Sequence, residues 1–227
     1  ERTLLAPIFA ASKPPVITSL LEHLDADLRV SSDALIIPGI ETGQGAVAIT
    51  LKNGKLLAEI AELALEDGVF KGQLAVERVG KDPRYALNGK LDGVEAGRLF
   101  QRSLGRNPLQ GRADATISLM TAGDTIEELL TGLGGKAKVV MRDGGRLGLD
   151  LRTTIQSAKR SELSGWQSIG AAVTGLDVLS LAIDVRHGVV HATIADAKSG
   201  TSTIFGGGYV DLHGKALEFS LGLKTAD

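Results

Sequence analysis

The sequence alternates apolar and polar residues over many short stretches, and residue pairs ending in glycine separate these stretches. An alternation with a period of two is typical of a half-buried β-strand. Asn-Gly and Asp-Gly pairs favour tight hairpin turns because both residues accept positive φ angles. We therefore predict a mostly β fold with a few helices, in which hairpins build an antiparallel sheet. The predicted turns are Asn53-Gly54, Asp67-Gly68, Asp143-Gly144, His187-Gly188 and His213-Gly214.

Three of the alternating stretches each place a set of large apolar residues on one face. One-sided strands of this kind are typical of antiparallel sheets with one face turned away from water. The faces allow two interpretations: a closed core covered by helices, or a curved sheet whose inner face is left partly open to a lipid chain. An open apolar face of that size would mark a binding site. The candidate lipid-facing residues are Val47, Ile49, Leu51, Leu181, Ile183, Val185, Leu217, Phe219 and Leu221.

Three consecutive glycines in the stretch Phe205 to Lys224 raise the question of a phosphate-binding loop. Such a loop needs its glycines between a strand and the start of a helix, where free backbone N–H groups meet the anion. Here the glycines are followed by a turn and by the alternation from Leu217 to Leu223. We therefore predict two strands joined by a turn, and no nucleotide site.

Composition excludes several classes of protein. The chain has 227 residues, 43% of them hydrophobic and 23% charged, which predicts a globular protein. Its 25 basic and 27 acidic residues are scattered singly, which argues against nucleic acid as a partner. Cysteine is absent, which excludes disulfides and thiol catalysis. Because the chain begins with Glu and shows no leader, we expect a fragment of a longer protein, which leaves room for a membrane anchor upstream.

An internal repeat relates two of the predicted hairpins. The stretch AITLKNGKLLAEIAEL (48–63) matches AIDVRHGVVHATIADA (182–197) without a gap. With a slip of one residue, VFKG (69–72) then matches IFGG (204–207). Repetition of a strand unit suggests an elongated protein that grows by addition. We predict one region over residues 1–227, with repeat units of about 25–93 and 109–224.

Helices are expected in only a few places, with about twice as much strand as helix. The segment 94–104 ends at a glycine, and the segment 124–133 begins with Asp124 as a cap and Glu127 three residues later. Parts of 149–172 are expected to be helical, as is a short segment after Pro14-Pro15.

No group of residues predicts catalysis or a metal centre. His187 and His191 have the spacing of two zinc ligands on a helix. However, the repeat places them in a hairpin, and residues four apart on a strand lie about 13 Å apart. No Ser, His and Asp cluster has a recognisable context. We therefore predict a protein that is not an enzyme and that uses no cofactor or metal.

The order of motifs resembles the C-terminal region of the AsmA family of Gram-negative envelope proteins. The resemblance runs from about Leu24 to Lys224, with one departure at TGLD (174–177). Its pieces are LDADLRVSSDALIIPGIETGQGAVAITLKNGKLL, FKGQLAVE, LQGRADATISLMTAGDTIEELLTGLGGKAKVVMRDGGRLGLDL, AIDVRHGVVHATIADA and GGGYVDLHGKALEFSLGLK.

This resemblance implies an elongated, curved, groove-like β structure related to TamB-like and chorein-type bridge proteins. It implies a periplasmic location, an N-terminal inner-membrane anchor, and a role in outer-membrane assembly or maintenance. The expected partners are phospholipid or another acyl-chain lipid, and envelope proteins. We expect a non-enzymatic lipid-binding or lipid-transfer protein. The alternatives are an assembly scaffold that binds proteins through its sheet edges around a closed core, and a hydrolase with an unrecognised site.

Overall fold

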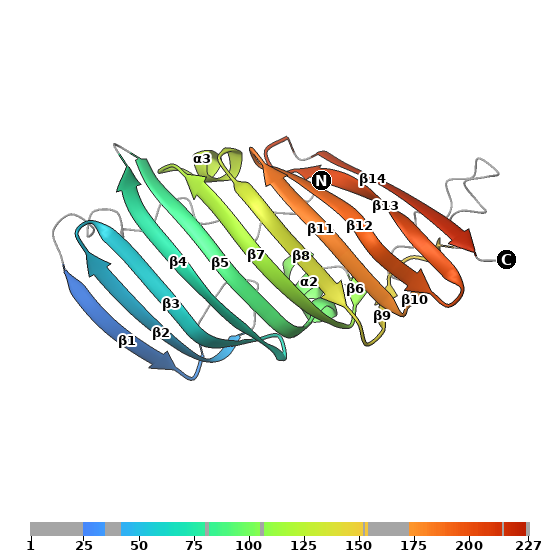
Figure 1. Ribbon diagram of the computed structural model, residues 1–227, viewed down its shortest axis with the longest axis horizontal. Helices are drawn as coiled ribbons and strands as arrows, with labels where there is room; N and C mark the ends of the chain where they lie inside the picture. Colours follow the sequence, from blue (N-terminus) through green and yellow to red (C-terminus); the bar gives the residue numbers. More distant parts are fainter. Residues whose placement is uncertain are drawn as a thin grey trace.

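A computed structural model describes residues 25–34, 42–79, 82–104, 107–151, 153, 173–214 and 216–225. Its main element is one sheet of eleven antiparallel strands that lie side by side along the long axis of the molecule (Figure 1). In spatial order these strands are β1 (Ala26–Ser32), β2 (Thr42–Lys52), β3 (Lys55–Leu65), β4 (Gly68–Val79), β5 (Asp82–Glu95), β7 (Arg112–Ala122), β8 (Gly134–Met141), β11 (Val178–Arg186), β12 (Val189–Ser199), β13 (Ser202–Asp211) and β14 (Ala216–Thr225).

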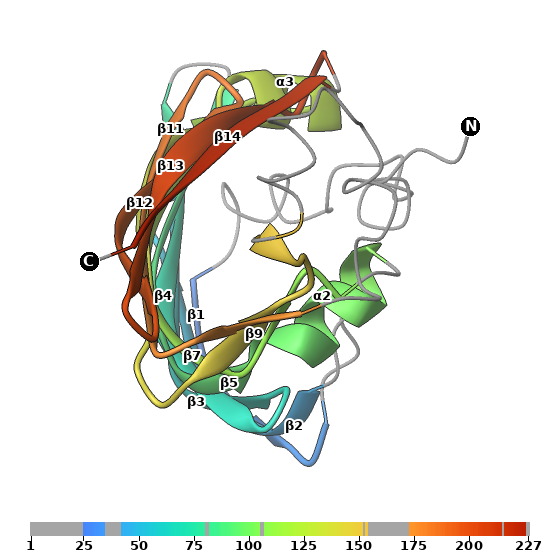
Figure 2. The same ribbon diagram turned by 90° about the vertical axis from the view of Figure 1, so that its right-hand side faces the viewer.

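The main sheet bends into an arch that is not closed into a barrel (Figure 2). A small sheet in the order β10 (Thr174–Leu176), β9 (Gly145–Leu147) and β6 (Leu109–Gln110) lies on the inner side of the arch. The helix α2 (Ala96–Leu104) lies on the same side, and α3 (Ile126–Thr131) lies at the opposite border of the sheet. We call the inner side the concave face and the other side the outer face. The predicted curved antiparallel sheet is confirmed, and within the described residues strand exceeds helix by far more than the expected factor of two.

Two of the predicted turns form tight hairpins as expected. Asn53 and Gly54 join β2 to β3 with φ angles of 51° and 72°, and His187 and Gly188 join β11 to β12 with φ angles of 50° and 75°. Positive φ at both central residues matches the right-handed twist of the flanking strands. His213-Gly214 also lies in a turn, where Asp211 accepts hydrogen bonds from both backbone N–H groups.

The other two predicted turns are wrong. Glu66 and Asp67 form the turn between β3 and β4, one residue earlier than expected, and Gly68 is the first residue of β4. A Cβ at Gly68 would lie 2.6 Å from the backbone of β5, so close packing of two strands requires this glycine. Asp143-Gly144 joins β8 to β9, which belong to different sheets, so this pair leads out of the main sheet.

The matched hairpins have the same strand register. Ile49 faces Ala58 across β2 and β3, and Ile183 faces Ala192 across β11 and β12, each 134 positions later. The third strands, β4 and β13, pair with the same offset. The register shifts also correspond, at Ala46/Val47 with Ser180/Leu181 and at Ile60/Leu63 with Thr193/Lys198. The larger repeat units of 25–93 and 109–224 stay a prediction.

The one-residue slip proposed after the hairpins is wrong. Phe70 pairs with Leu63 on the concave face, whereas Phe205 pairs with Gly222 on the outer face. A slip of one residue moves a strand side chain to the other face, so these phenylalanines are not equivalent. Without the slip, Phe70 corresponds to Ile204, which is buried on the concave face.

Two of the four predicted helical segments lie within the described residues and form α2 and α3, each shorter than predicted, and the cap of α3 differs from the prediction. Thr125, not Asp124, is the N-cap, and Glu128, not Glu127, completes the capping box. The Glu128 carboxylate accepts hydrogen bonds from the backbone N–H groups of Asp124 and Thr125, which hold its pKa below the ordinary value. The helix expected after Pro14-Pro15 and most of the 149–172 segment lie outside the described residues.

Two ion pairs connect α2 to the turn between β3 and β4. Arg98 Nη1 lies 2.7 Å from Asp67 Oδ2, and Arg102 Nε lies 3.3 Å from Glu66 Oε1. The Glu66 residue is only 4% exposed. Its burial raises the pKa of the Glu66 carboxyl; the positive charge of Arg98 opposes this rise and the negative charge of Asp67 adds to it.

This raised pKa predicts a pH dependence of stability. At a pH below the ordinary carboxyl value, Glu66 is protonated in both the folded and the unfolded chain. As the pH rises through that value toward the raised pKa, the unfolded chain releases its proton first, so the free energy of unfolding falls. Glu66→Gln should remove this fall in the free energy of unfolding with rising pH. Glu62→Gln, at an exposed position of β3, should keep it. Urea unfolding at several pH values measures both; equal slopes in the two variants would contradict the assignment.

Candidate functional site

A row of eleven residues without a polar side chain crosses the concave face, one residue from each strand of the main sheet. Each neighbour in the row pairs directly with the next across adjacent strands. Strands lie about 4.8 Å apart, so the row spans about 48 Å along the long axis. We call it the central row; from β1 to β14 it consists of Val30, Val47, Ile60, Gly72, Gly89, Ile117, Ala137, Ile183, Ala192, Gly208 and Phe219.

Apolar rows also flank the central row on both sides. Together the three rows form a continuous apolar band across the arch, in register from strand to strand. The flanking row nearer α3 consists of Leu28, Ile49, Ala58, Leu74, Leu87, Leu119, Gly135, Val185, Val190 and Val210. The flanking row nearer the small sheet consists of Leu63, Phe70, Leu91, Ala115, Val139, Leu181 and Ile194.

The outer face has the opposite character along the same axis. A paired row there is mostly charged or polar, and some of its members bond to each other or to neighbours. Ser118 donates a hydrogen bond of 2.7 Å to Asn88, and Asp184 forms an ion pair of 2.8 Å with Arg186. The sheet is therefore two-sided, with water on one face and an apolar band on the other. This outer row is Ala48, Glu59, Gln73, Asn88, Ser118, Lys136, Asp184, His191, Tyr209 and Glu218.

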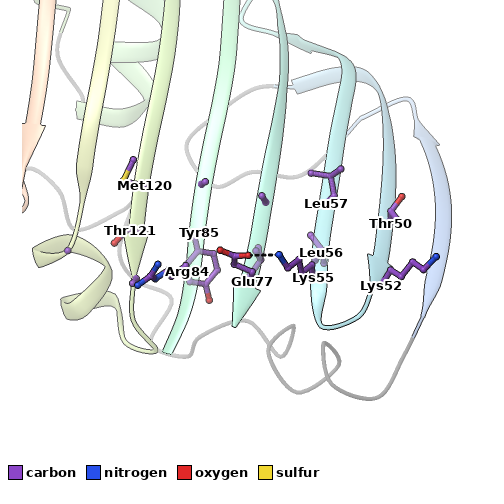
Figure 3. A pocket seen from close by; sticks show the side chains of 15 residues that line it. Thr50, Lys52, Lys55, Leu56, Leu57, Glu77, Arg84, Tyr85, Met120 and Thr121 are labelled. Carbon is purple, nitrogen blue, oxygen red and sulfur yellow. Dashed lines mark ion pairs between the residues drawn. The ribbon is translucent and has the colours of Figure 1, made fainter. Parts of the chain in front are cut away.

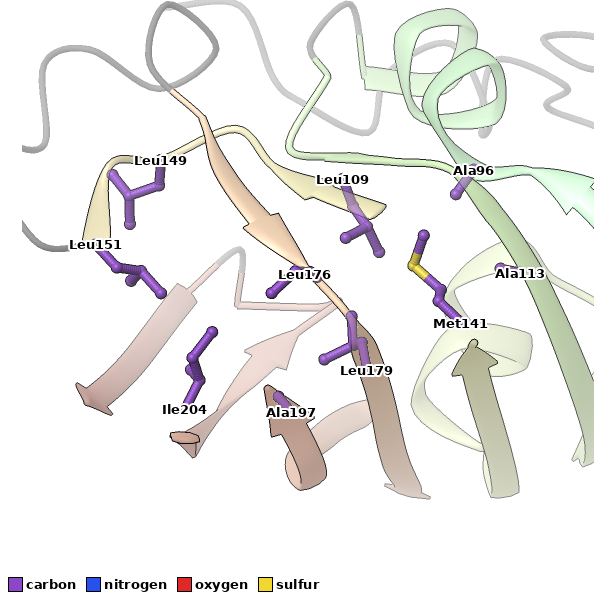
Figure 4. Close-up of a cluster of buried hydrophobic side chains, with 10 residues drawn as sticks. All are labelled: Ala96, Leu109, Ala113, Met141, Leu149, Leu151, Leu176, Leu179, Ala197 and Ile204. Atoms are coloured by element: carbon purple, nitrogen blue, oxygen red, sulfur yellow. The ribbon is translucent and has the colours of Figure 1, made fainter. Parts of the chain in front are cut away.

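Part of the concave face is closed by the small sheet (Figure 4). Leu109, Leu147 and Leu176 come from this sheet and pack against the ends of β7, β8 and β11 to β13. None of the central-row residues belongs to the closed cluster. The closed cluster consists of Ala96, Leu109, Ala113, Met141, Leu149, Leu151, Leu176, Leu179, Ala197 and Ile204.

The apolar band reaches both edges of the sheet. At the β1 edge, Leu28 and Val30 are 53% and 45% exposed, and at the β14 edge Phe219 is 40% exposed. Between the edges the band is partly covered, because Leu63 and Val185 are 5% and 6% exposed and Leu181 packs against the closed cluster. Large exposed apolar patches, such as those at its two edges, often mark binding sites. The band is therefore the candidate functional site. It is a long surface that crosses the whole sheet rather than a deep pocket.

The far edge of the Phe70 ring lies over the two adjacent glycines of the central row, Gly72 and Gly89. A Cβ at Gly72 would lie 2.8 Å from the Phe70 ring, and a Cβ at Gly89 would contact the same ring. The two glycines thus leave room for the ring to lie against the sheet. A larger residue at either position would collide with the ring, and at Gly72 also with the backbone carbonyl oxygen of Asn88.

Comparison with known protein families identifies the family to which the chain belongs. The model of the AsmA family matches residues 10–194, which is most of the sequence. The chain belongs to the AsmA family. Membership in the AsmA family associates it with the envelope of Gram-negative bacteria. No curated protein and no solved structure matches the chain. Among the helices described, neither is long and apolar enough to cross a membrane.

The pairing places eight of the nine predicted site residues of this AsmA-family chain on the concave side, while their contact with lipid stays a prediction. Val47, Ile183 and Phe219 belong to the central row, and Ile49, Val185 and Leu181 to the flanking rows. Leu51 is buried in a small cluster with Val76, and Leu221 packs against the closed cluster. Leu217 faces Val210 in the register, and its side chain lies outside the described part.

Sequence reasoning missed the middle of the band. Ile60, Gly72, Gly89 and Ala137 lie in the central row but were not predicted as site residues. The alternation in β3 to β5 and in β8 was the available signal. It was incomplete because glycines replace the large apolar residues at two of these places.

The two histidines behave as hairpin residues. His187 occupies the turn between β11 and β12 with a positive φ angle. On the outer face, the centroid of the His191 ring lies 6.1 Å from that of the Tyr209 ring. Within the described ranges, no three His, Cys, Asp or Glu side chains gather as metal ligands. We predict that replacing both histidines by Ala leaves the metal content of the purified protein unchanged. Elemental analysis measures this, and zinc that is stoichiometric in the wild type and lost in the double variant would contradict it.

Proposed function

We propose that this protein is a non-enzymatic periplasmic component of the Gram-negative envelope, held at the inner membrane, that binds phospholipid acyl chains along the apolar band. Its role would be in the assembly or maintenance of the outer membrane. The observation that carries the proposal is the central row, which offers no polar side chain from one edge of the sheet to the other. Family membership supports the location, and the two-sided sheet supports the ligand class.

The binding energy in this proposal comes from burial of hydrocarbon. Each CH₂ group removed from water contributes about 0.8 kcal/mol, and an acyl chain has no polar group that needs a partner in the band. The charged head group remains in water on the open side of the arch. Because the rows are apolar at every strand, a chain meets a similar surface at each position. Movement along the sheet would then need no energy source within this domain.

The direct experiment is organic extraction of the purified protein followed by lipid mass spectrometry. We expect phospholipid to purify with the protein in stoichiometric amounts, or to be taken up from phospholipid vesicles if purification removes it. A protein that neither retains nor takes up phospholipid would contradict the proposal.

One observation favours a second candidate, a scaffold that binds a protein partner at a sheet edge. β1 is an edge strand whose Leu28 and Val30 are exposed, and exposed edge strands pair readily with another chain. In that case Leu28→Lys, which places a charge on this edge strand, should release the partner. A partner retained after Leu28→Lys, as measured by crosslinking in cells, would exclude recruitment through this edge.

A further inference from the structure

A hollow of about 630 Å³ lies on the outer face, opposite the apolar band (Figure 3). Two adjacent cross-strand rows over β2, β3, β4, β5 and β7 form most of its lining, which also includes Leu56, Val76, Tyr85, Thr121 and Gly132. The inner row is Thr50, Leu57, Ala75, Ala86 and Met120, and the rim row is Lys52, Lys55, Glu77, Arg84 and Ala122. This volume is within the range of small-molecule sites, and the hollow is separate from the proposed lipid band.

The hollow is formed by small residues between larger ones. Ala75 and Ala86 pair with each other in the middle of the inner row, and Leu57 and Met120 border them on either side. Met120 is 63% exposed. The middle of the hollow is therefore an apolar surface open to water, on a face whose neighbouring cross-strand row is mostly charged or polar.

The rim carries an excess of positive charge. Lys55 and Glu77 form an ion pair of 3.1 Å, which neutralises one basic residue. In the part of the chain that the structure describes, neither Lys52 nor Arg84 takes part in an ion pair. Among the described residues that line the hollow, Glu77 is the only acidic one. An anionic group at this rim would find two cations without a partner.

The backbone favours a hydrocarbon chain over an extended peptide as the apolar part of the ligand. β2, β3, β4, β5 and β7 each pair with a strand on both sides, so they offer no free edge for another strand. A peptide lying across them would leave its own N–H and C=O groups against Ala, Leu and Met side chains, which is costly. A hydrocarbon chain has no such groups.

We propose that this hollow binds a single-chain amphiphile with an anionic head group, either carboxylate or phosphate. The hydrocarbon lies over Ala75 and Ala86 between Leu57 and Met120, and the head group contacts Arg84 or Lys52. The site goes beyond the proposed function, because it uses the other face of the sheet and does not require lipid in the band.

The two methionines of the chain allow a test that distinguishes the faces. Met120 lies in the hollow, and Met141 is 1% exposed in the closed cluster on the concave side. The protein is labelled with ¹³C at the methionine methyl groups and titrated with sodium dodecanoate below its micelle concentration. We expect saturable movement of the Met120 signal. Dodecanol, which has no charge, and Arg84→Gln should each weaken the binding about fivefold, the usual limit for an exposed ion pair.

Further variants separate this site from the apolar band. Ala86→Gln, which fills the hollow with an exposed polar side chain, should abolish the Met120 response. Ile183→Asp, on the concave face, should leave that response unchanged whether or not the band binds lipid. The proposal is overturned if dodecanoate leaves Met120 unchanged, if it moves only Met141, or if dodecanol binds as tightly. It is likewise overturned if an acidic peptide moves Met120 and dodecanoate does not, because the hollow would then be a protein-binding site.

Discussion

Ile183→Asp is expected to leave the protein folded and to remove the phospholipid that purifies with it. Ile183 lies in the central row, outside the closed cluster. On an open face its carboxylate reaches water, so the charge costs the fold little. An acyl chain that covers an unpaired carboxylate removes this charge from water, which costs several kcal/mol and opposes binding of the lipid. Lipid mass spectrometry and thermal melting followed by circular dichroism measure the two effects.

The matched control places the same charge one residue away on the opposite face. Ala182 is an exposed neighbour in β11, so Ala182→Asp should retain both the fold and the lipid. Ile49→Asp, at the repeat-equivalent position in β2, should behave like Ile183→Asp. Unfolding of both isoleucine variants would indicate a closed core and favour the scaffold. Retained fold with retained lipid would place the lipid elsewhere.

Leu179→Asp is expected to unfold the domain, although Leu179 lies on the same strand and the same face as Ile183. Leu179 is 6% exposed and packs under the small sheet with Met141 and Leu176. A charge there has no route to water. The variant also loses the transfer energy of the leucine, which alone costs about 2–5 kcal/mol in a Leu→Ala substitution. Both costs together approach the stability of a typical domain.

The contrast between positions 179 and 183 tests where the closed part of the concave face ends. Leu179→Ala is the milder variant and should lower the free energy of unfolding by about 2–5 kcal/mol without unfolding the protein at 25 °C. Urea unfolding measures this loss. A Leu179→Asp variant with wild-type stability would show that the small sheet does not seal this end.

Local sequence patterns sufficed to predict the fold class. They failed to predict turns at places where the conformation depends on a contact between strands that are distant in the sequence. Asn53-Gly54 and His187-Gly188 formed turns as predicted because two residues with positive φ are enough. Gly68 looked like a turn residue, but β5 lies against it and leaves no room for a Cβ. Asp143-Gly144 has the sequence of a hairpin, yet its strands belong to different sheets because β9 pairs with β6 and β10.

The candidate site could be predicted only in fragments. The alternation of apolar and polar residues predicts which residues of a single strand share a face, as it did for Ile49 and Ile183. It does not predict how these faces align across eleven strands. The alignment depends on register shifts, for example between Ile60 and Leu63, that have no clear sequence signal. The outer hollow was missed for the same reason, because Ala75 and Ala86 are unremarkable until pairing brings them together.

Site-specific photocrosslinking tests the central claim most directly. A photoreactive amino acid replaces either Ile183 in the central row or Ala182 on the outer face of the full-length protein in Gram-negative cells. After irradiation, intact-protein mass spectrometry detects a phospholipid adduct. We expect adducts at position 183 and none at position 182, because neighbouring residues of a strand point to opposite faces. No adduct at position 183, or equal adducts at both positions, would contradict the proposal that the concave apolar band binds lipid.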